Sequence, residues 1–280
     1  MTVDRIIRGA LAEDAPWGDV TSEALLPAGA RASAELVARE PGVLSGGTAF
    51  ARTFELADPA VEAEIMVADG ARIASGEVLA RVEGPARSVL RAERVALNLV
   101  QRMSGIATAT AAYVEAVAGT RARIVDTRKT APGLRLLDRQ AVRDGGGGNH
   151  RFSLSDAVLV KDNHLAVLAA AGIGAGDAIR RARAKLGHTV HLEVEVDRLD
   201  QIEEVVAAGV DTIMLDNFGL DELRAGVALV AGRALVEASG GVSLTSVTGI
   251  AAAGVDIISV GALTHSVRAL DLGLDVRVTA

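Results

Sequence analysis

The chain has 280 residues, of which half are apolar and about 2% aromatic, so its core is built mainly from Ala, Val, Leu and Ile. A net charge of −7 without a Lys- or Arg-rich segment argues against nucleic acid as the main partner. Cysteine is absent, which excludes disulfides, thiolate metal sites and a cysteine nucleophile. The N-terminal residues do not have the pattern of a signal peptide, and no run of about 18 apolar residues predicts a membrane span, so we expect a cytoplasmic protein.

The first third of the chain predicts a small, β-rich domain. Residues 1–27 indicate a short helix and a turn, and segments 31–40, 61–70 and 76–84 have the composition of strands separated by glycines. We interpret this region as sandwich-like. Residues 88–118 have helical periodicity, which we expect to be interrupted near 104–108.

A different rhythm follows, in which six short apolar runs alternate with amphipathic segments. The runs are 122–126, 157–160, 189–196, 212–215, 234–238 and 256–260, and the helical segments lie near 174–186, 198–208, 219–230 and 244–253. Continuous apolar strands that alternate with helices predict a parallel sheet covered on both faces. We favour an α/β barrel over a doubly wound sheet, because no G-x-G-x-x-G follows the first strand.

Polar residues gather directly after these predicted strands, at the end where barrel enzymes place their active sites. They comprise four cations, four carboxylates and three imidazoles: Arg128, Lys129, Arg151 and Lys161; Glu193, Glu195, Asp216 and Glu237; His150, His164 and His265. Cations favour an anionic substrate, and acids among them suit Mg²⁺ or sugar hydroxyls. Structural alternatives remain: a glutamate of the 193–195 pair could simply balance a lysine, and Asp126 could only orient Arg128.

The stretch "DGGGGNHR" at 144–151 suggests a phosphate-binding loop, but two later glycine junctions fit that role better. Ser239-Gly240-Gly241 and Gly261 each follow a late predicted strand and precede a helical segment. Free backbone N–H groups and a helix N-terminus there would bind phosphate. We therefore interpret the four-glycine run as a bend that aims His150 and Arg151 at a carboxylate.

Nine ordered sequence blocks closely resemble the nicotinate-nucleotide pyrophosphorylase (carboxylating) family, also called quinolinate phosphoribosyltransferase. They are "GDVTSEALLP", "LNLVQRMSGIAT", "DTRKTAPGLR", "GGGGNHR", "DAVLVKDNH", "EVEVD", "MLDNF", "EASGGV" and "VGALTHSVRALDLGLDV". The resemblance implies an N-terminal α/β sandwich domain, residues 1–105 joined by the tail 266–280, and an incomplete, seven-stranded α/β barrel at 106–265. It also implies homodimers or hexamers of dimers that share active sites.

The reaction implied by this resemblance transfers phosphoribosyl from phosphoribosyl pyrophosphate to quinolinate, with Mg²⁺. The products are nicotinate mononucleotide, pyrophosphate and CO₂, in de novo NAD synthesis.

Residue roles follow from the same resemblance. Arg128, His150 and Arg151 match positions that hold the quinolinate carboxylates, with Lys129 and Lys161 beside them. Arg102 matches an arginine lent by the neighbouring subunit. Glu195 and Asp216 match the carboxylates that serve Mg²⁺ and the ribose. The 5′-phosphate side is matched by a further set: Ser239, Gly240, Gly241, Gly261 and His265.

Asp144, just before the glycine run, departs from the family pattern, as do Arg139 and Gln140. An acid near an anion site is unfavourable unless it is paired, for example with Arg143 or Arg139. Alternatives therefore stay open: a paralogue acting on another pyridine carboxylate, or the pyrophosphorylase-like protein of molybdate transport loci. A Schiff-base lyase using Lys161 and a non-catalytic nucleotide-binding module are more distant ones.

Overall fold

The computed structural model describes residues 2–279, which form two compact units. The first unit comprises 2–111, 130–146 and 263–279, and the second comprises 112–129 and 147–262. This division differs from the boundaries expected from the sequence in three segments, 106–111, 130–146 and 263–265, of which 130–146 is the longest. Residues 130–146, expected in the barrel domain, cluster with the N-terminal residues, and helix α5 (Arg135–Asp144) accounts for most of that segment.

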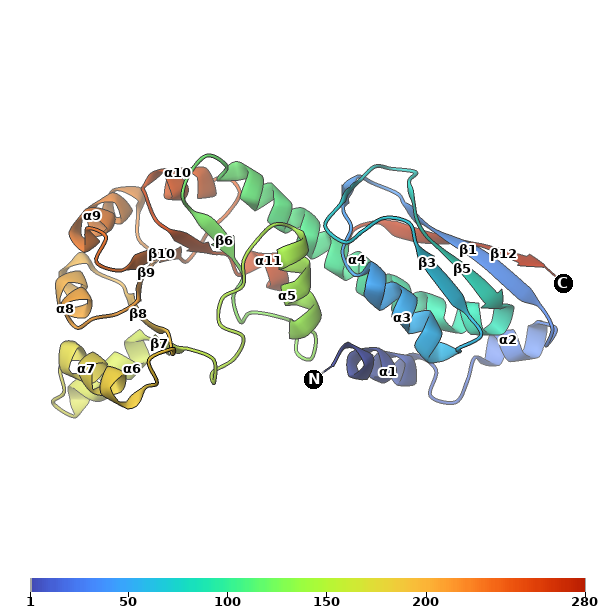
Figure 1. The fold of residues 1–280 in the computed structure, drawn as a ribbon, viewed down its shortest axis with the longest axis horizontal. Coiled ribbons are helices and arrows are strands. Elements are labelled where there is room, and N and C mark those ends of the chain that lie inside the picture. The colour runs from blue at the N-terminus through green and yellow to red at the C-terminus, as the bar shows by residue number, and fades with distance from the viewer. Residues whose placement is uncertain (1, 280) are drawn as a thin grey trace. The chain divides into compact units, whose positions relative to one another are not determined.

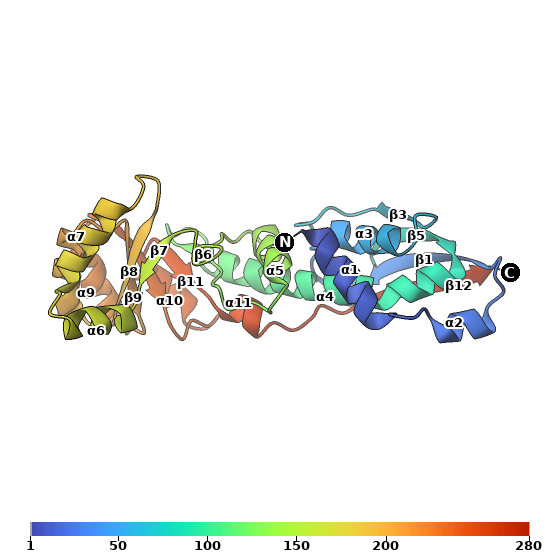
Figure 2. The same ribbon diagram turned by 90° about the horizontal axis from the view of Figure 1, so that it is seen from below.

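An antiparallel sheet of order β12-β1-β5-β3 organises the first unit (Figure 1). Its strands are Leu272–Thr279, Arg31–Ala38, Val78–Pro85 and Glu62–Ile65, and β2 (Gly42–Val43) pairs with β4 (Arg72–Ile73) in a separate small sheet. The helices are α1 (Val3–Asp14), α2 (Val20–Leu25), α3 (Gly47–Ala57) and the long α4 (Ala86–Ala116). Strand β12 runs beside β1 along its whole length, so the C-terminal segment completes this sheet (Figure 2).

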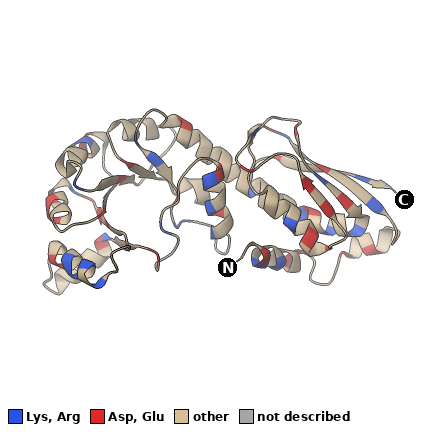
Figure 3. Cartoon of the chain, in the orientation of Figure 1, with Lys and Arg blue, Asp and Glu red and all other residues tan. Residues whose placement is uncertain are grey.

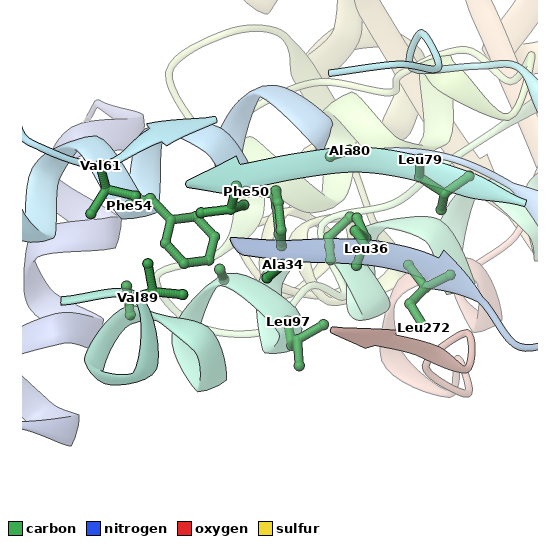
Figure 4. Close-up of a cluster of buried hydrophobic side chains, with 14 of the residues drawn as sticks. Ala34, Leu36, Phe50, Phe54, Val61, Leu79, Ala80, Val89, Leu97 and Leu272 are labelled. Carbon is green, nitrogen blue, oxygen red and sulfur yellow. The ribbon is translucent and has the colours of Figure 1, made fainter. Parts of the chain in front are cut away.

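Alternation along the strands gives the sheet one apolar face. In β1, Ala32, Ala34 and Leu36 are buried while the residues between them are more exposed, as a period of two requires. This face packs against α3 and α4, whose aromatic and aliphatic side chains complete the cluster (Figure 4). Phe50 and Phe54 meet edge to face, with ring centroids 5.1 Å apart.

Helix α4 runs without a break from Ala86 to Ala116, so the interruption expected near 104–108 is wrong. The small residues there mark close packing. A Cβ on Gly105 would lie 2.2 Å from the carbonyl oxygen of Arg268, and the Ser104 hydroxyl accepts a hydrogen bond from the Ser45 N–H at 3.0 Å. Glycine therefore lets another backbone segment pass against the helix.

The second unit contains a parallel sheet of six strands in the order β6-β11-β10-β9-β8-β7. Their bounds are Arg123–Val125, Ile257–Ser259, Leu235–Ser239, Thr212–Asp216, Leu192–Val196 and Val158–Val160, so all six apolar runs form the predicted strands. The connecting helices are α6 (Asp162–Ala170), α7 (Ala175–Lys185), α8 (Ile202–Ala207) after the short turn η1 (Leu199–Gln201), α9 (Leu220–Val230) and α10 (Val247–Ala252), followed by α11 (Ala262–His265). The curved sheet carries α8, α9 and α10 on its outer side (Figure 1).

Six strands are one fewer than the seven implied by the resemblance. Next to β6, the glycine run contributes a single parallel bridge, between Gly148 and Val125, rather than a strand. The outer helices α7 and α9 carry charges of both signs, whereas α8 carries only acidic ones (Figure 3). Between residues 2 and 279, no helix combines the length and apolar character that a membrane span needs.

Candidate active site

A cavity of about 550 Å³ opens at the carboxyl ends of the parallel strands. Its lining gathers ten of the thirteen residues to which the family resemblance gives a role: Arg128, Lys129, His150, Arg151, Lys161, Glu195, Asp216, Ser239, Gly240 and Gly241. Thr127, Leu159, Met214, Asn217 and Ser259 complete it. The remaining predicted residues, Arg102, Gly261 and His265, are not part of this lining, and Arg102 and His265 belong to the first unit.

Basic side chains from three segments converge on this cavity. The Arg151 guanidinium donates to the carbonyl of Ala157 at 3.0 Å. Burial, followed by the charge of Arg128, lowers the pKa of Arg151, which indicates that the two guanidiniums lie near each other. Two neighbouring arginines repel each other until an anion joins them, so this part of the cavity suits a planar carboxylate.

Asp126 holds the segment that follows the glycine run. It is fully buried, and its carboxylate accepts from the Asn149 side chain and from the backbone N–H of His150, both at 2.7 Å. The backbone of Gly148 is joined to Ile124 and Asp126 at the edge of the sheet. The Asp126 side chain thus fixes the main chain of His150, a role that was not predicted from the sequence.

The His150 side chain reaches two buried glutamates of the parallel sheet. Its Nε2 lies 3.0 Å from Glu193 Oε2 and 3.5 Å from Glu237 Oε1, and the glutamates are only 3% and 2% exposed. Nδ1 accepts the backbone N–H of Arg151 at 2.7 Å. Both ring nitrogens therefore have partners within the protein, so the ring lines the cavity as a wall.

Within the described residues, His150, Glu193 and Glu237 also form the cluster whose potential ligand atoms lie within 4.8 Å of one another. Burial, followed by the charge of Glu193, raises the pKa of Glu237 to about 8. Burial lowers the pKa of His150, but the hydrogen bond to Glu193 and the two carboxylate charges outweigh it, so that pKa is raised. A doubly protonated ring would point an Nδ1 proton at the Arg151 N–H, and this contact favours the neutral ring.

The glycine junction after β10 forms a tight loop at the cavity rim. Gly240 and Gly241 have φ values of +90° and +58°, and a Cβ on Gly240 would lie 2.2 Å from Asn217 Oδ1. Helix α10 begins only at Val247 and has six residues, and α11 after Gly261 has four. Any phosphate here would therefore be bound mainly by loop N–H groups, and the helix-dipole contribution expected from the sequence is small.

Glu195 and Asp216 lie on neighbouring strands and line the same cavity. Glu195 forms an ion pair with the Lys161 ammonium, and Asp216 Oδ2 accepts from the Asn217 side chain at 2.7 Å. Mg²⁺ is commonly bound by one or two carboxylates together with substrate phosphates and water. Two carboxylates at the rim of a basic cavity fit that donor set.

Arg102 has a defined place within the first unit. Its guanidinium pairs with both oxygens of Asp138 at 2.8 Å each and also donates to the Thr264 carbonyl at 3.1 Å. Asp138 is fully buried and additionally accepts the Ala131 N–H at 3.2 Å. Asp138 could not be identified as a buried residue from the sequence, because an acid in a polar helix is expected to be exposed.

Two other residues singled out in the sequence also lie in the first unit. His265 Nδ1 is 2.6 Å from the Ser266 hydroxyl. Asp144, the acid that departs from the family pattern, accepts the Ser45 hydroxyl at 2.6 Å. The hydrogen bond to Ser45 explains how this carboxylate is accommodated, and Asp144 is not among the residues lining the cavity.

Comparison with known proteins assigns both units. The N-terminal and C-terminal domains of quinolinate phosphoribosyl transferase match residues 19–104 and 106–275. The nicotinate-nucleotide pyrophosphorylase [carboxylating] of Mycobacterium leprae is 46% identical over 96% of this chain and 95% of its own, and a probable one of Bacillus subtilis is 42% identical over 95% and 91%. The crystal structure of NadC from Streptococcus pyogenes has a TM-score of 0.93 at 43% identity, covering 99% of this chain and 96% of its own.

Proposed function

The chain belongs to the quinolinate phosphoribosyl transferase family, and we propose that its barrel cavity transfers phosphoribosyl from phosphoribosyl pyrophosphate to quinolinate with loss of CO₂. The products are nicotinate mononucleotide and pyrophosphate, as in de novo NAD synthesis. One observation supports this assignment above the others. A single cavity at the strand ends gathers four cations, two carboxylates and a glycine loop, which suits a substrate pair rich in carboxylate and phosphate groups.

Quinolinate carries two carboxylates on a planar ring, and the cavity offers two arginines to them. We assign the carboxylates to Arg128 and Arg151, because a guanidinium fork matches a carboxylate in two hydrogen bonds. His150 forms the wall beside the ring, since its nitrogens are already engaged. Lys129 and Lys161 supply point charges toward the pyrophosphate, and the loop at 239–241, with Gly261 and His265, is assigned to the 5′-phosphate side.

The first step of the reaction requires little proton transfer by the protein. The pyridine nitrogen attacks C1′ of the ribose as the C1′–O bond to pyrophosphate breaks, and the electron pair leaves with pyrophosphate. Positive charge that develops on the ribose is stabilised by Glu195 or Asp216, and negative charge on the leaving group by the lysines. The C2–carboxylate bond then breaks, its electrons remain on C2 beside the positive pyridinium nitrogen, and a proton replaces the CO₂.

We assign Mg²⁺ to Glu195 and Asp216, completed by substrate oxygens and water. Bound there, the ion would neutralise charge on the pyrophosphate. Lys161 already pairs with Glu195, so this lysine must share the carboxylate with the metal or turn toward the substrate.

The proposal extends to the oligomeric state and the cellular compartment. We assign the chain to a homodimer, or a hexamer of dimers, in which Arg102 of one copy reaches the cavity of another. The segment around Gly148 is our candidate for the position of a seventh barrel strand, since it already forms one parallel bridge. We place the enzyme in the cytoplasm.

A substrate panel tests the assignment. Purified protein with phosphoribosyl pyrophosphate and Mg²⁺ should convert quinolinate and leave nicotinate unchanged. Conversion of a different pyridine carboxylate would instead indicate a paralogue. The Lys161 lyase alternative is disfavoured because the Glu195 carboxylate stabilises the charged ammonium, which is no nucleophile. Trapping of substrate on Lys161 by borohydride would contradict this view.

A further inference from the structure

Two buried glutamates beneath the cavity have no role in the chemistry described so far. Glu193 and Glu237 project from β8 and β10, which lie on either side of β9, and approach the same His150 nitrogen at 3.0 Å and 3.5 Å. Among the described residues, the ion-pair contacts of both glutamates are with His150. Glu193 Oε1 and Glu237 Oε1 are buried without a hydrogen-bond partner.

Two ionised carboxylates cannot share one neutral imidazole at this depth. Each buried charge costs several kcal/mol of solvation free energy unless it is paired, and like charges a few ångströms apart add to that cost. The contact between Nδ1 and the Arg151 N–H places the imidazole proton on Nε2, from which it is donated to Glu193. A second proton is needed for Glu237.

We propose that Glu237 is a positioning residue that acts as a neutral carboxylic acid, donating its proton to the Glu193 carboxylate and so holding His150 as the wall of the substrate cavity. The resulting chain runs from the Arg151 N–H through the His150 ring to Glu193 and Glu237. It satisfies the buried acids with one negative charge instead of two.

The same arrangement matters for substrate binding, and this consequence rests on the proposed function. The cavity above the pair is basic and receives a dianion, so a second buried negative charge would weaken binding. The ionisable groups that face Glu237 are Glu193 from β8 and His150 from the loop, and Met214 pairs beside it on β9. Ser259 on β11 interacts with Glu237 as a hydrogen-bonding side chain that lowers its pKa, but burial and the charge of Glu193 outweigh this effect. Its raised pKa agrees with a neutral acid at pH 7.

The alternative occupant of this cluster is a divalent metal ion, because one imidazole and two carboxylates are common ligands. A metal would need the Nε2 lone pair, and therefore a proton on Nδ1, which would break the contact with the Arg151 N–H. The observed hydrogen bonds favour the proton-bridged arrangement.

Two spectroscopic measurements test the proposal without any assay of activity. In ¹⁵N-histidine spectra at pH 7, with the His150 signals identified through a His150→Gln variant, the proton should reside on Nε2. The infrared difference between native protein and Glu237→Gln should contain the carbonyl stretch of a protonated carboxylic acid. A proton on Nδ1, carboxylate bands alone, or stoichiometric Zn²⁺ or Mn²⁺ binding that Glu237→Gln abolishes would each overturn the proposal.

A kinetic readout separates positioning from a merely structural role. Raising the pH from 7 to 9 should increase the KM of the native protein for quinolinate about tenfold more than the KM of Glu237→Gln. The reason is that ionised Glu237 adds a negative charge that repels the substrate carboxylates at an effective dielectric constant of about 20. The KM for phosphoribosyl pyrophosphate serves as the internal comparison. Identical pH profiles of native protein and variant would overturn the proposal, whereas absence of turnover in both would count against the proposed function and leave the spectroscopic test standing.

Discussion

Replacing Arg102 by alanine should destabilise the protein as well as impair any role in catalysis. Asp138 has no exposed surface and depends on two 2.8 Å hydrogen bonds from Arg102, with the Ala131 N–H as a longer third contact. Removing one partner of a buried pair leaves an uncompensated charge, which costs about 3 to 5 kcal/mol. We therefore expect Arg102→Ala to lower the free energy of unfolding by about that amount.

The double variant Arg102→Ala/Asp138→Asn should recover part of this loss, because it removes both charges. Asp138→Asn alone should lower the free energy of unfolding by about 1 to 2 kcal/mol, since the Arg102 side chain is 27% exposed and can reach water. Urea unfolding should be followed by circular dichroism, because Trp17 is 93% exposed and a poor reporter of the core. A loss below about 1 kcal/mol for Arg102→Ala would refute the reasoning.

Three further predictions concern the cavity at the strand ends and Asp144. Burial and Glu193 hold the pKa of Glu237 at about 8 instead of 4.5, so between these pH values the native state retains a proton that the unfolded chain releases. The free energy of unfolding should therefore fall as the pH rises through this window, by up to about 4 to 5 kcal/mol. Urea unfolding of Glu237→Gln should lack this loss. Gly240→Ala should raise the KM for phosphoribosyl pyrophosphate at least about tenfold through its clash with Asn217. The control Gly232→Ala, at a positive φ with open space and outside the cavity lining, should leave this KM unchanged and lower the free energy of unfolding by about 1 kcal/mol. Asp144→Ala should lower the free energy of unfolding by about 1 to 2 kcal/mol through loss of the Ser45 hydrogen bond, and should change the KM for quinolinate less than about twofold. A large change in KM would indicate that Asp144 belongs to the substrate site.

The parallel sheet and most of its site could be predicted because each strand is an apolar run that ends in polar residues. That pattern located all six strands and placed Lys161, Glu195 and Asp216 at one edge. The helix α3 was missed, since its residues follow a glycine-rich stretch that resembles a loop. In α4, Gly105 packs against the backbone of Arg268, a contact that the sequence does not reveal because the two residues are distant in it.

Buried polar contacts were the hardest part to foresee. Alternation shows that Glu193 and Glu195 share one face of a strand, but it does not reveal which of them reaches the cavity. That distinction depends on the stagger of the strands, which leaves Glu195 at the rim and Glu193 beneath it with His150. Asp126 and Asp138 were underestimated for a similar reason, because their partners come from segments that only the fold brings together.

One measurement tests the central claim most directly: the fate of label in quinolinate carrying ¹³C in its C2 carboxylate, incubated with phosphoribosyl pyrophosphate and Mg²⁺. We predict that all of the label leaves as CO₂, with one nicotinate mononucleotide and one pyrophosphate formed for each quinolinate consumed. Retention of the label in a nucleotide product, or turnover of nicotinate in place of quinolinate, would contradict the account.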